Sequence, residues 1–326
     1  MTLARRSLLA LPALAPTLAP TLASAQSWPT RPITLIVPFA AGGNVDTAAR
    51  VVAPELSRRL GQSVVVENVP GAGGTIGVER VARAAPDGHT LIVAVESTMG
   101  IAPVLTPQAV RYDAVRDFAP VAMLATLPLT LVGRNDLGAA DFPALVELAK
   151  RGQGLTYATS GVGTAHHLLG EIIAQRTGAK LEHVPYRVSA QIPTDVMGGR
   201  LDLTILTITL TAPLVREGKI KPYAVSSPAP HPLLPGVPTL NSQPGLAGLN
   251  LEVWQGIFAP ARTDPAIVAR LAAETSAALA ETEVQNRLAS IGMTPSTLAR
   301  DALGAYLREE ITRYTDVIRS ANIRVD

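Results

Sequence analysis

Hydrophobic and polar positions follow two periodicities in turn along most of the chain. Short apolar runs bounded by Pro, Gly or Asp predict strands, and apolar residues spaced three or four apart predict helices. Strands are expected at 33–37, 64–66, 90–95, 155–159, 181–184, 201–206, 220–226 and 253–258. Helices are expected at 45–60, 76–85, 141–151, 164–176, 190–197, 265–281, 283–290 and 297–320. This alternation predicts an α/β fold, with a parallel or mixed sheet between helices.

Two longer apolar segments mark changes in this pattern. One covers 121–132 and is broken by Pro128, and the other is the strand at 253–258. The stretch 100–117 has no clear periodicity, and 228–244 is proline-rich coil. We expect two hinge crossings between two lobes, with residues 26–127 and 254–326 in lobe 1 and residues 128–253 in lobe 2. A cleft outside the carboxyl ends of such strands is the usual ligand site.

The first 25 residues have the pattern of a signal peptide. Arg5 and Arg6 precede an uncharged Leu/Ala/Pro run, and Ala23-Ser24-Ala25 predicts cleavage after Ala25. A membrane anchor is the alternative, but three prolines interrupt a run shorter than the roughly 20 residues that span a bilayer. The export route stays open between the Sec and twin-arginine pathways. Both routes predict a periplasmic protein.

Composition excludes several function classes. The chain has 28 basic and 26 acidic residues, and two of the basic residues belong to the signal peptide. The remaining charges balance, so nothing forms the basic surface of a nucleic-acid-binding protein. The chain has no cysteine, and no metal-ligand spacing, nucleotide fingerprint or nucleophile–base pair is recognisable. We therefore predict no catalytic residue, no metal and no cofactor.

Loops rich in glycine and hydroxyl residues follow three strands and precede three helices, at 38–46, 70–77 and 158–167. Glycine lets backbone N–H groups approach a ligand, and the positive end of a helix favours an anion. Each loop is equally explained as an ordinary turn, and Thr164 as a helix cap. A fourth segment pairs Tyr186 with Asp195, either around a ligand or within a capped helix.

These loops lack Lys and Arg, which sites for phosphate commonly use. We therefore expect a small organic acid, or a related small molecule, held by amides and waters. The candidate ligand-binding residues are Phe39, Ala40, Ala41, Gly42, Gly43, Asp46, Gly74, Thr75, Ser97, Thr98, Thr159, Ser160, Gly161, Gly163, Thr164, His167, Tyr186 and Asp195.

In order and spacing, these segments resemble the Bug-type solute-binding receptors of tripartite tricarboxylate transporters. The resemblance rests on Pro38 to Gly43 with Asp46, Glu67-Asn68, Pro70 to Gly74, Pro86-Asp87-Gly88, Asp117 to Val121, Ser160 to Thr164, Val184-Pro185-Tyr186, Pro235 to Leu240 and Trp254-Gln255-Gly256. It implies a two-lobed periplasmic-binding-protein fold of type II that closes on its ligand. It also implies that main-chain amides, hydroxyls and bridging waters hold a ligand carboxylate. This carboxylate would lie between the first loop, residues 38–46, and the hydroxyl-glycine loop, residues 158–167.

The leading hypothesis is a monomeric periplasmic receptor, not an enzyme, that delivers its ligand to an inner-membrane permease. One alternative is a sensory or orphan receptor that reports ligand occupancy to a sensor protein. Another is a secreted enzyme on a similar fold. The sequence does not separate these functions.

Overall fold

The computed structural model describes residues 28–186 and 189–324. The predicted signal peptide lies outside these residues. The strands are β1 (Ile33–Val37), β2 (Val64–Asn68), β3 (Thr90–Val95), β4 (Phe118–Gly133), β5 (Leu155–Thr159), β6 (Leu181–Pro185), β7 (Leu203–Thr207), β8 (Lys221–Val225), β9 (Glu252–Pro260) and β10 (Thr294–Pro295). The helices are α1 (Asn44–Leu60), α2 (Thr75–Ala82), α3 (Ala102–Leu105), α4 (Phe142–Lys150), α5 (Ala165–Thr177), α6 (Ile192–Met197), α7 (Ile208–Arg216), α8 (Pro265–Ala280), α9 (Thr282–Ser290) and α10 (Arg300–Ser320).

The first part of the sheet has the order β2-β1-β3-β9-β4, and its first three strands are parallel. Alternate residues of β1 face opposite sides, as a strand requires. Leu35 packs in one core with Val52 of α1, and Ile36 packs in a second core with Val78 of α2 and Leu303 of α10. Helices therefore cover both faces, which explains why these strands are apolar throughout.

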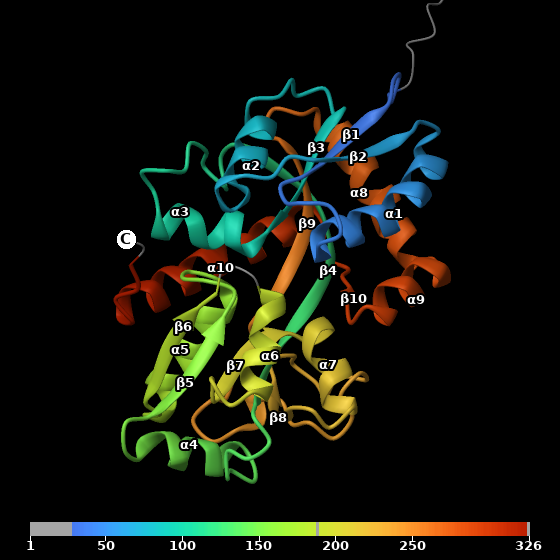
Figure 1. Cartoon of the computed structure of the whole chain (residues 1–326). Coiled ribbons are helices and arrows are strands. Elements are labelled where there is room, and N and C mark those ends of the chain that lie inside the picture. Colours follow the sequence, from blue (N-terminus) through green and yellow to red (C-terminus); the bar gives the residue numbers. More distant parts are fainter. Residues whose placement is uncertain (1–27, 187–188, 325–326) are drawn as a thin grey trace, which may run out of the picture.

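The second part of the sheet continues from β4 in the order β4-β7-β5-β6, and β8 also pairs with β4. Strands β5, β6 and β7 are parallel to one another. Leu131 and Leu155 pack in the larger core, whereas Val132 and Ala158 pack with Ile192 of α6 on the other side. The two parts of the sheet are thus built alike, and β4 and β9 run between them in Figure 1.

The prediction that Pro128 breaks the apolar segment 121–132 is wrong, because β4 runs without interruption from Phe118 to Gly133. Pro128 lies opposite Glu252 of β9, and the next residue, Leu129, lies opposite Thr207 of β7. Proline has no N–H to donate to a sheet ladder. It is tolerated here because β4 changes partners at this point.

Two helical segments escape the sequence-based prediction. The stretch read as irregular contains a π-helical turn, Ser97–Ile101, followed directly by α3. Helix α7 begins with a run of Thr, Ile and Leu residues whose β-branched members favour strand. Ile208, Thr211 and Ala212 are buried on one side of α7, at the three- and four-residue spacing of a helix. The β-branched composition obscures this spacing in the sequence. Both segments begin where a strand ends, which is the edge of an α/β sheet where ligand sites usually lie.

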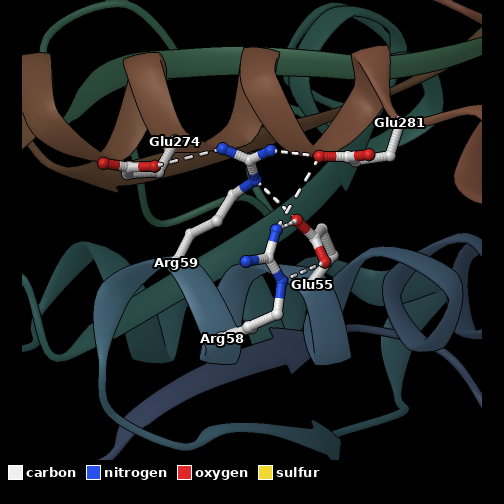
Figure 2. A network of polar contacts seen from close by, with 5 residues as sticks. All are labelled: Glu55, Arg58, Arg59, Glu274 and Glu281. Carbon is white, nitrogen blue, oxygen red and sulfur yellow. Dashed lines mark hydrogen bonds and ion pairs between the residues drawn. The ribbon is translucent and has the colours of Figure 1, made fainter.

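A network of ion pairs holds α1 against α8 (Figure 2). Arg59 contacts Glu55 of its own helix at 2.6 Å, Glu274 of α8 at 3.8 Å and Glu281 at the end of α8. Arg58 lies 3.7 Å from the same Glu281 carboxylate. A single exposed ion pair contributes little to the stability of the folded protein. In a network, each ordered side chain serves several pairs, so the entropy cost per pair is smaller. These contacts fix the direction in which α1 presents its N-terminus.

Candidate functional site

The carboxyl ends of both sets of parallel strands face each other. The end of β3, Val95, lies opposite Gln255, which lies opposite Ala125 of β4. The end of β7, Thr207, lies opposite Leu129 of the same strand. Ala125 and Leu129 are four residues apart, which is about 13 Å at a rise of about 3.3 Å per residue. The loops that follow the parallel strands therefore line one region between the two parts of the sheet. We call this region, between Ala125 and Leu129 of β4, the interval.

The loop between β1 and α1 is held by one carboxylate. Asp46, which is 3 % exposed, accepts hydrogen bonds from the Gly42 N–H, from Asn68 Nδ2 and from Arg50 Nε, each at 2.9 Å. Asn68 Nδ2 also donates to the Phe39 carbonyl at 3.0 Å. The Asp46 side chain thus serves the loop itself. Its role as a ligand contact stays a prediction.

Residues from three predicted segments meet beside this loop. A methyl group added at Gly74 would lie 2.8 Å from Thr98 Cγ2 and 3.0 Å from Phe39 Cζ. The Thr98 hydroxyl is buried and donates to the Val95 carbonyl at 3.0 Å. The Thr75 hydroxyl donates to the Ala72 carbonyl at 2.9 Å. Both hydroxyls therefore stabilise their own turns, and Gly74 is required because Phe39 and Thr98 leave no room for a side chain.

The π-helical turn brings the first half of the chain against the second. Ser97 opens the turn and is partly exposed. A methyl group added at Gly163, beyond β5, would lie 2.0 Å from Leu105 Cδ2 of α3 and 4.0 Å from Ile101 Cγ2. Local π-helical turns are frequent at functional sites. Here the turn places α3 directly against the hydroxyl-glycine loop.

The hydroxyl-glycine loop between β5 and α5 is closed by side-chain bonds. Thr164 donates to the Gly161 carbonyl at 2.9 Å and accepts from the His167 N–H at 3.3 Å, as a helix cap does. The Ser160 hydroxyl lies 2.9 Å from His166 Nδ1. The Thr164 hydroxyl is thus occupied by capping, whereas Ser160 is partly exposed beside it.

Two histidines support this loop from behind. The rings of His167 and His183 are stacked, with centroids 3.8 Å apart. His167 Nδ1 accepts the Gly163 N–H at 3.1 Å, and His183 Nε2 lies 2.7 Å from the Thr159 hydroxyl. His167 is buried. It therefore positions the loop through its contacts with Gly163 and His183, and its contact with ligand stays a prediction.

Tyr186 and Asp195, each predicted to contact a ligand, contact each other. The Tyr186 hydroxyl donates to Asp195 Oδ2 at 2.6 Å, and Arg200 donates to Asp195 Oδ1 at 2.8 Å. The Tyr186 N–H donates to the Thr159 carbonyl at 3.0 Å. Tyr186 is therefore attached to the hydroxyl-glycine loop, and Asp195 orients its ring.

Three helices begin at this interval with incompletely capped N-termini. Among the described residues, no side chain caps α1 after Gly43 or α7 after Thr207, and Thr164 caps α5 through a single N–H. The first N–H groups of a helix have no partner within the helix, and they carry its partial positive charge. Ala40, Ala41 and the two glycines after them are exposed. The arrangement offers backbone donors to a small anion from both sides.

Charged side chains contribute little net field here. Burial raises the pKa of Glu96, next to Ser97, to about 8, so its carboxyl is mostly protonated at pH 7. Burial also lowers the pKa of His166 to about 4, and burial followed by the His167 charge lowers that of His183 to about 4. Burial alone would raise the pKa of Asp46, but hydrogen bonds from Arg50, Gly42 and Asn68 lower it.

Sequence reasoning missed the contribution of α7. Thr207 and Thr209 lie at its start, with their hydroxyl oxygens 2.8 Å apart. A strand followed by hydroxyl residues is the same signal that identified Ser160 and Thr164. The signal was hidden because no glycine separates β7 from α7.

No helix within residues 28–186 and 189–324 is both long and apolar enough to cross a membrane. In the same residues, no group of three or more His, Cys, Asp or Glu side chains is arranged to bind a metal ion.

Known proteins similar to this chain include periplasmic and solute-binding proteins. The protein BugT of Bordetella pertussis is 33 % identical over 304 residues, which cover 93 % of each chain. A solved structure of an R. palustris protein with adipate has 32 % identity and a TM-score of 0.79, covering 91 % of this chain and 99 % of that one. MatC from Rhodopseudomonas palustris, solved with bound malate, has 35 % identity and a TM-score of 0.74, covering 89 % and 100 %.

These likenesses confirm the predicted periplasmic-binding-protein fold and the resemblance to Bug proteins. The family model named TctC, described as the tripartite tricarboxylate transporter family receptor, matches residues 48–323. This match covers most of the chain. The protein therefore belongs to the tripartite tricarboxylate transporter family of receptors, the solute-binding proteins of the Bug type.

Proposed function

We propose that this receptor captures a small carboxylate between two lobes in the periplasm and delivers it to a tripartite tricarboxylate-type permease. Relatives solved with adipate and malate support a carboxylate as the ligand class. The predicted signal peptide, cleaved after Ala25, supports export. We further propose that the receptor acts as a monomer.

One observation carries this proposal. Loops of glycine or hydroxyl residues at the starts of α1, α5 and α7 face the same interval, and the N–H groups of these helix starts are available there as donors. Such donors suit a carboxylate, whose oxygens accept several hydrogen bonds at once. The proposed direct contacts are the amide of Gly43, the Ser97 and Ser160 hydroxyls, and the amides around Gly161.

The proposed lobes are residues 26–127 with 254–326 and residues 128–253. The change of strand partners between Pro128 and Leu129 supports the first boundary. The start of β9 at Glu252 supports the second. Lobes joined through two strands close by a hinge motion. Small-angle scattering with saturating ligand should give a smaller radius of gyration, and an unchanged radius would argue for a rigid site.

Mass spectrometry of the molecule released from freshly purified, denatured protein tests the ligand class. We expect an organic acid, which should then raise the melting temperature of the emptied protein. A screen in which carboxylates have no effect, while sugars or phosphate stabilise the protein, would contradict the proposal.

A further inference from the structure

A cavity of about 280 Å³ lies between α1, α7 and the end of α9. This volume approaches the lower end of the range for small-molecule pockets. Polar side chains of Asn44, Thr209 and Ser290 line it, together with apolar Ile208 and Leu233. The lining comes from both proposed lobes, so the shape of the cavity depends on how far the lobes close.

The cavity adjoins the proposed carboxylate site. Asn44 directly follows Gly43, the N-cap of α1, and the Thr209 hydroxyl touches that of Thr207, the N-cap of α7. The turn after α9 packs against the start of α7, since a methyl group at Gly292 would lie 2.9 Å from Ile208 Cγ2. A ligand bound at the two helix starts can therefore extend into this cavity.

Arg216 lines the cavity two turns further along α7. Arg216 is exposed, and its guanidinium forms no ion pair or side-chain hydrogen bond with a described residue. The neighbouring Glu217 is paired with Lys219 at 2.7 Å, which is the main cause that lowers the Glu217 pKa, and the Arg216 charge adds a smaller part. Helical side chains lean toward the N-terminus of their helix. Arg216 therefore leans toward Thr209, and a guanidinium without an acidic partner is suited to bidentate binding of a carboxylate.

We infer that the cavity is a second anion subsite, in which Arg216 binds the distal carboxylate of an extended diacid while the helix starts hold the proximal one. This inference rests on the proposed function. Thr209 and Arg216 are seven residues apart, or about 10 Å along the helix axis. The subsite therefore selects unbranched diacids long enough to reach the guanidinium over their shorter homologues and over monoacids.

Calorimetric titration of purified, ligand-free protein tests this inference. The probes are unbranched diacids from succinate to suberate, each beside the monoacid of equal chain length. Wild-type protein should bind at least one longer diacid, and Arg216→Gln should weaken that binding at least tenfold while leaving monoacid affinity unchanged. Arg216→Lys should restore only part of the loss, since lysine lacks the bidentate fork. Arg116→Gln, which removes a charge from a side chain that is 87 % exposed, is the matched control and should bind as wild type.

Filling the cavity tests the inference without removing the charge. Ser290 is exposed, and its hydroxyl donates only to the Arg287 carbonyl. Ser290→Phe should exclude longer diacids while monoacids still bind. Diacid binding that survives both Arg216→Gln and Ser290→Phe would overturn the subsite but leave the carboxylate receptor intact. A wild-type protein that binds no acid in either series would overturn both.

Discussion

The loop of residues 38–46 is held by full charges, whereas the loop of residues 159–167 is held by imidazoles and hydroxyls. In the first, Asp46 bonds Gly42 and Arg50. In the second, His167 and His183 are stacked, and they bond Gly163 and Thr159. Both loops present the start of a helix to the same interval. The same backbone geometry can therefore be fixed by unrelated side-chain chemistry. The two loops should accordingly lose their shape at different pH values and through different substitutions.

The loops also differ in how tightly neighbouring segments confine their glycines. Gly163 has φ +71, and a methyl group there would overlap Leu105 of α3. Gly43 has φ −76, and a methyl group there would meet only the Ala40 carbonyl, at 3.6 Å. The contact between the second loop and α3 therefore requires glycine at position 163, whereas a methyl group at position 43 of the first loop can be accommodated.

Gly163→Ala should have the largest effect. A side chain at this φ costs about 1–2 kcal/mol, and the overlap with Leu105 adds to this cost when the lobes close. We expect ligand affinity to fall more than tenfold by calorimetry, while Gly43→Ala binds within a fewfold of wild type. Equal losses in the two variants would remove the distinction between the loops.

Asp46→Ala should come next. It leaves the Gly42 N–H and Asn68 without their charged acceptor, and such bonds contribute about 1.5–3 kcal/mol each. Urea denaturation should show a loss of about 2–3 kcal/mol, with reduced affinity because the loop loses its shape. Glu147→Ala removes an exposed carboxylate paired only with its neighbour Lys150, and should change stability by less than 0.5 kcal/mol.

The pH dependence should separate the loops. His183 has a folded pKa of about 4, lowered mainly by burial from its ordinary value of 6.5. Between these values the unfolded chain binds more protons at His183, so the contribution of His183 to stability is complete above about pH 6.5 and falls as the pH drops toward 4. The Asp46 pKa is lowered below 3.8, so its contribution is lost only at more acidic pH.

In urea titrations at pH 7, 5.5 and 4.5, the His183 contribution should decline with pH, and His183→Gln should remove about 1–2 kcal/mol of pH-dependent loss relative to wild type. The raised pKa of Glu96 acts in the opposite direction, equally in both proteins. Asp46→Asn should leave the slope in this window unchanged. If Asp46→Asn flattens the slope and His183→Gln does not, the roles assigned to the two loops are reversed.

Thr164→Ala should have the smallest effect of the four. Its hydroxyl caps α5 and bonds Gly161, so we expect a loss of about 1 kcal/mol in stability. Affinity measured at a temperature where both proteins are folded should change less than tenfold. A larger loss of affinity with an unchanged melting temperature would make Thr164 a ligand contact after all.

The sequence predicted most strands and helices because their periodicity and their Gly and Pro boundaries are local signals. Strands β1, β3 and β5 have the predicted limits, and Gly61 and Gly178 end their helices in the left-handed conformation. Helix α7 was not predicted because the β-branched residues at its start favour a strand. Tertiary packing overrides that strand preference. The continuity of β4 through Pro128 was hidden because it depends on which strand lies beside it.

The candidate site was predictable as a set of loops but not as a set of contacts. Glycine and hydroxyl residues after strands identified the loops at α1 and α5. Whether a side chain faces a ligand or its own backbone depends on distances between segments, as Asp46 with Asn68 and His167 with His183 illustrate. The approach of Leu105 to Gly163 joins distant parts of the chain, so no local pattern indicates it.

A crystal structure of the protein with its co-purified or best-binding acid tests the central claim most directly. The account predicts a carboxylate between the starts of α1 and α5, with its oxygens within hydrogen-bond distance of amides near Gly43 and Gly161, directly or through one water. A carboxylate held instead by side-chain cations outside this interval, or by one lobe alone, would contradict it.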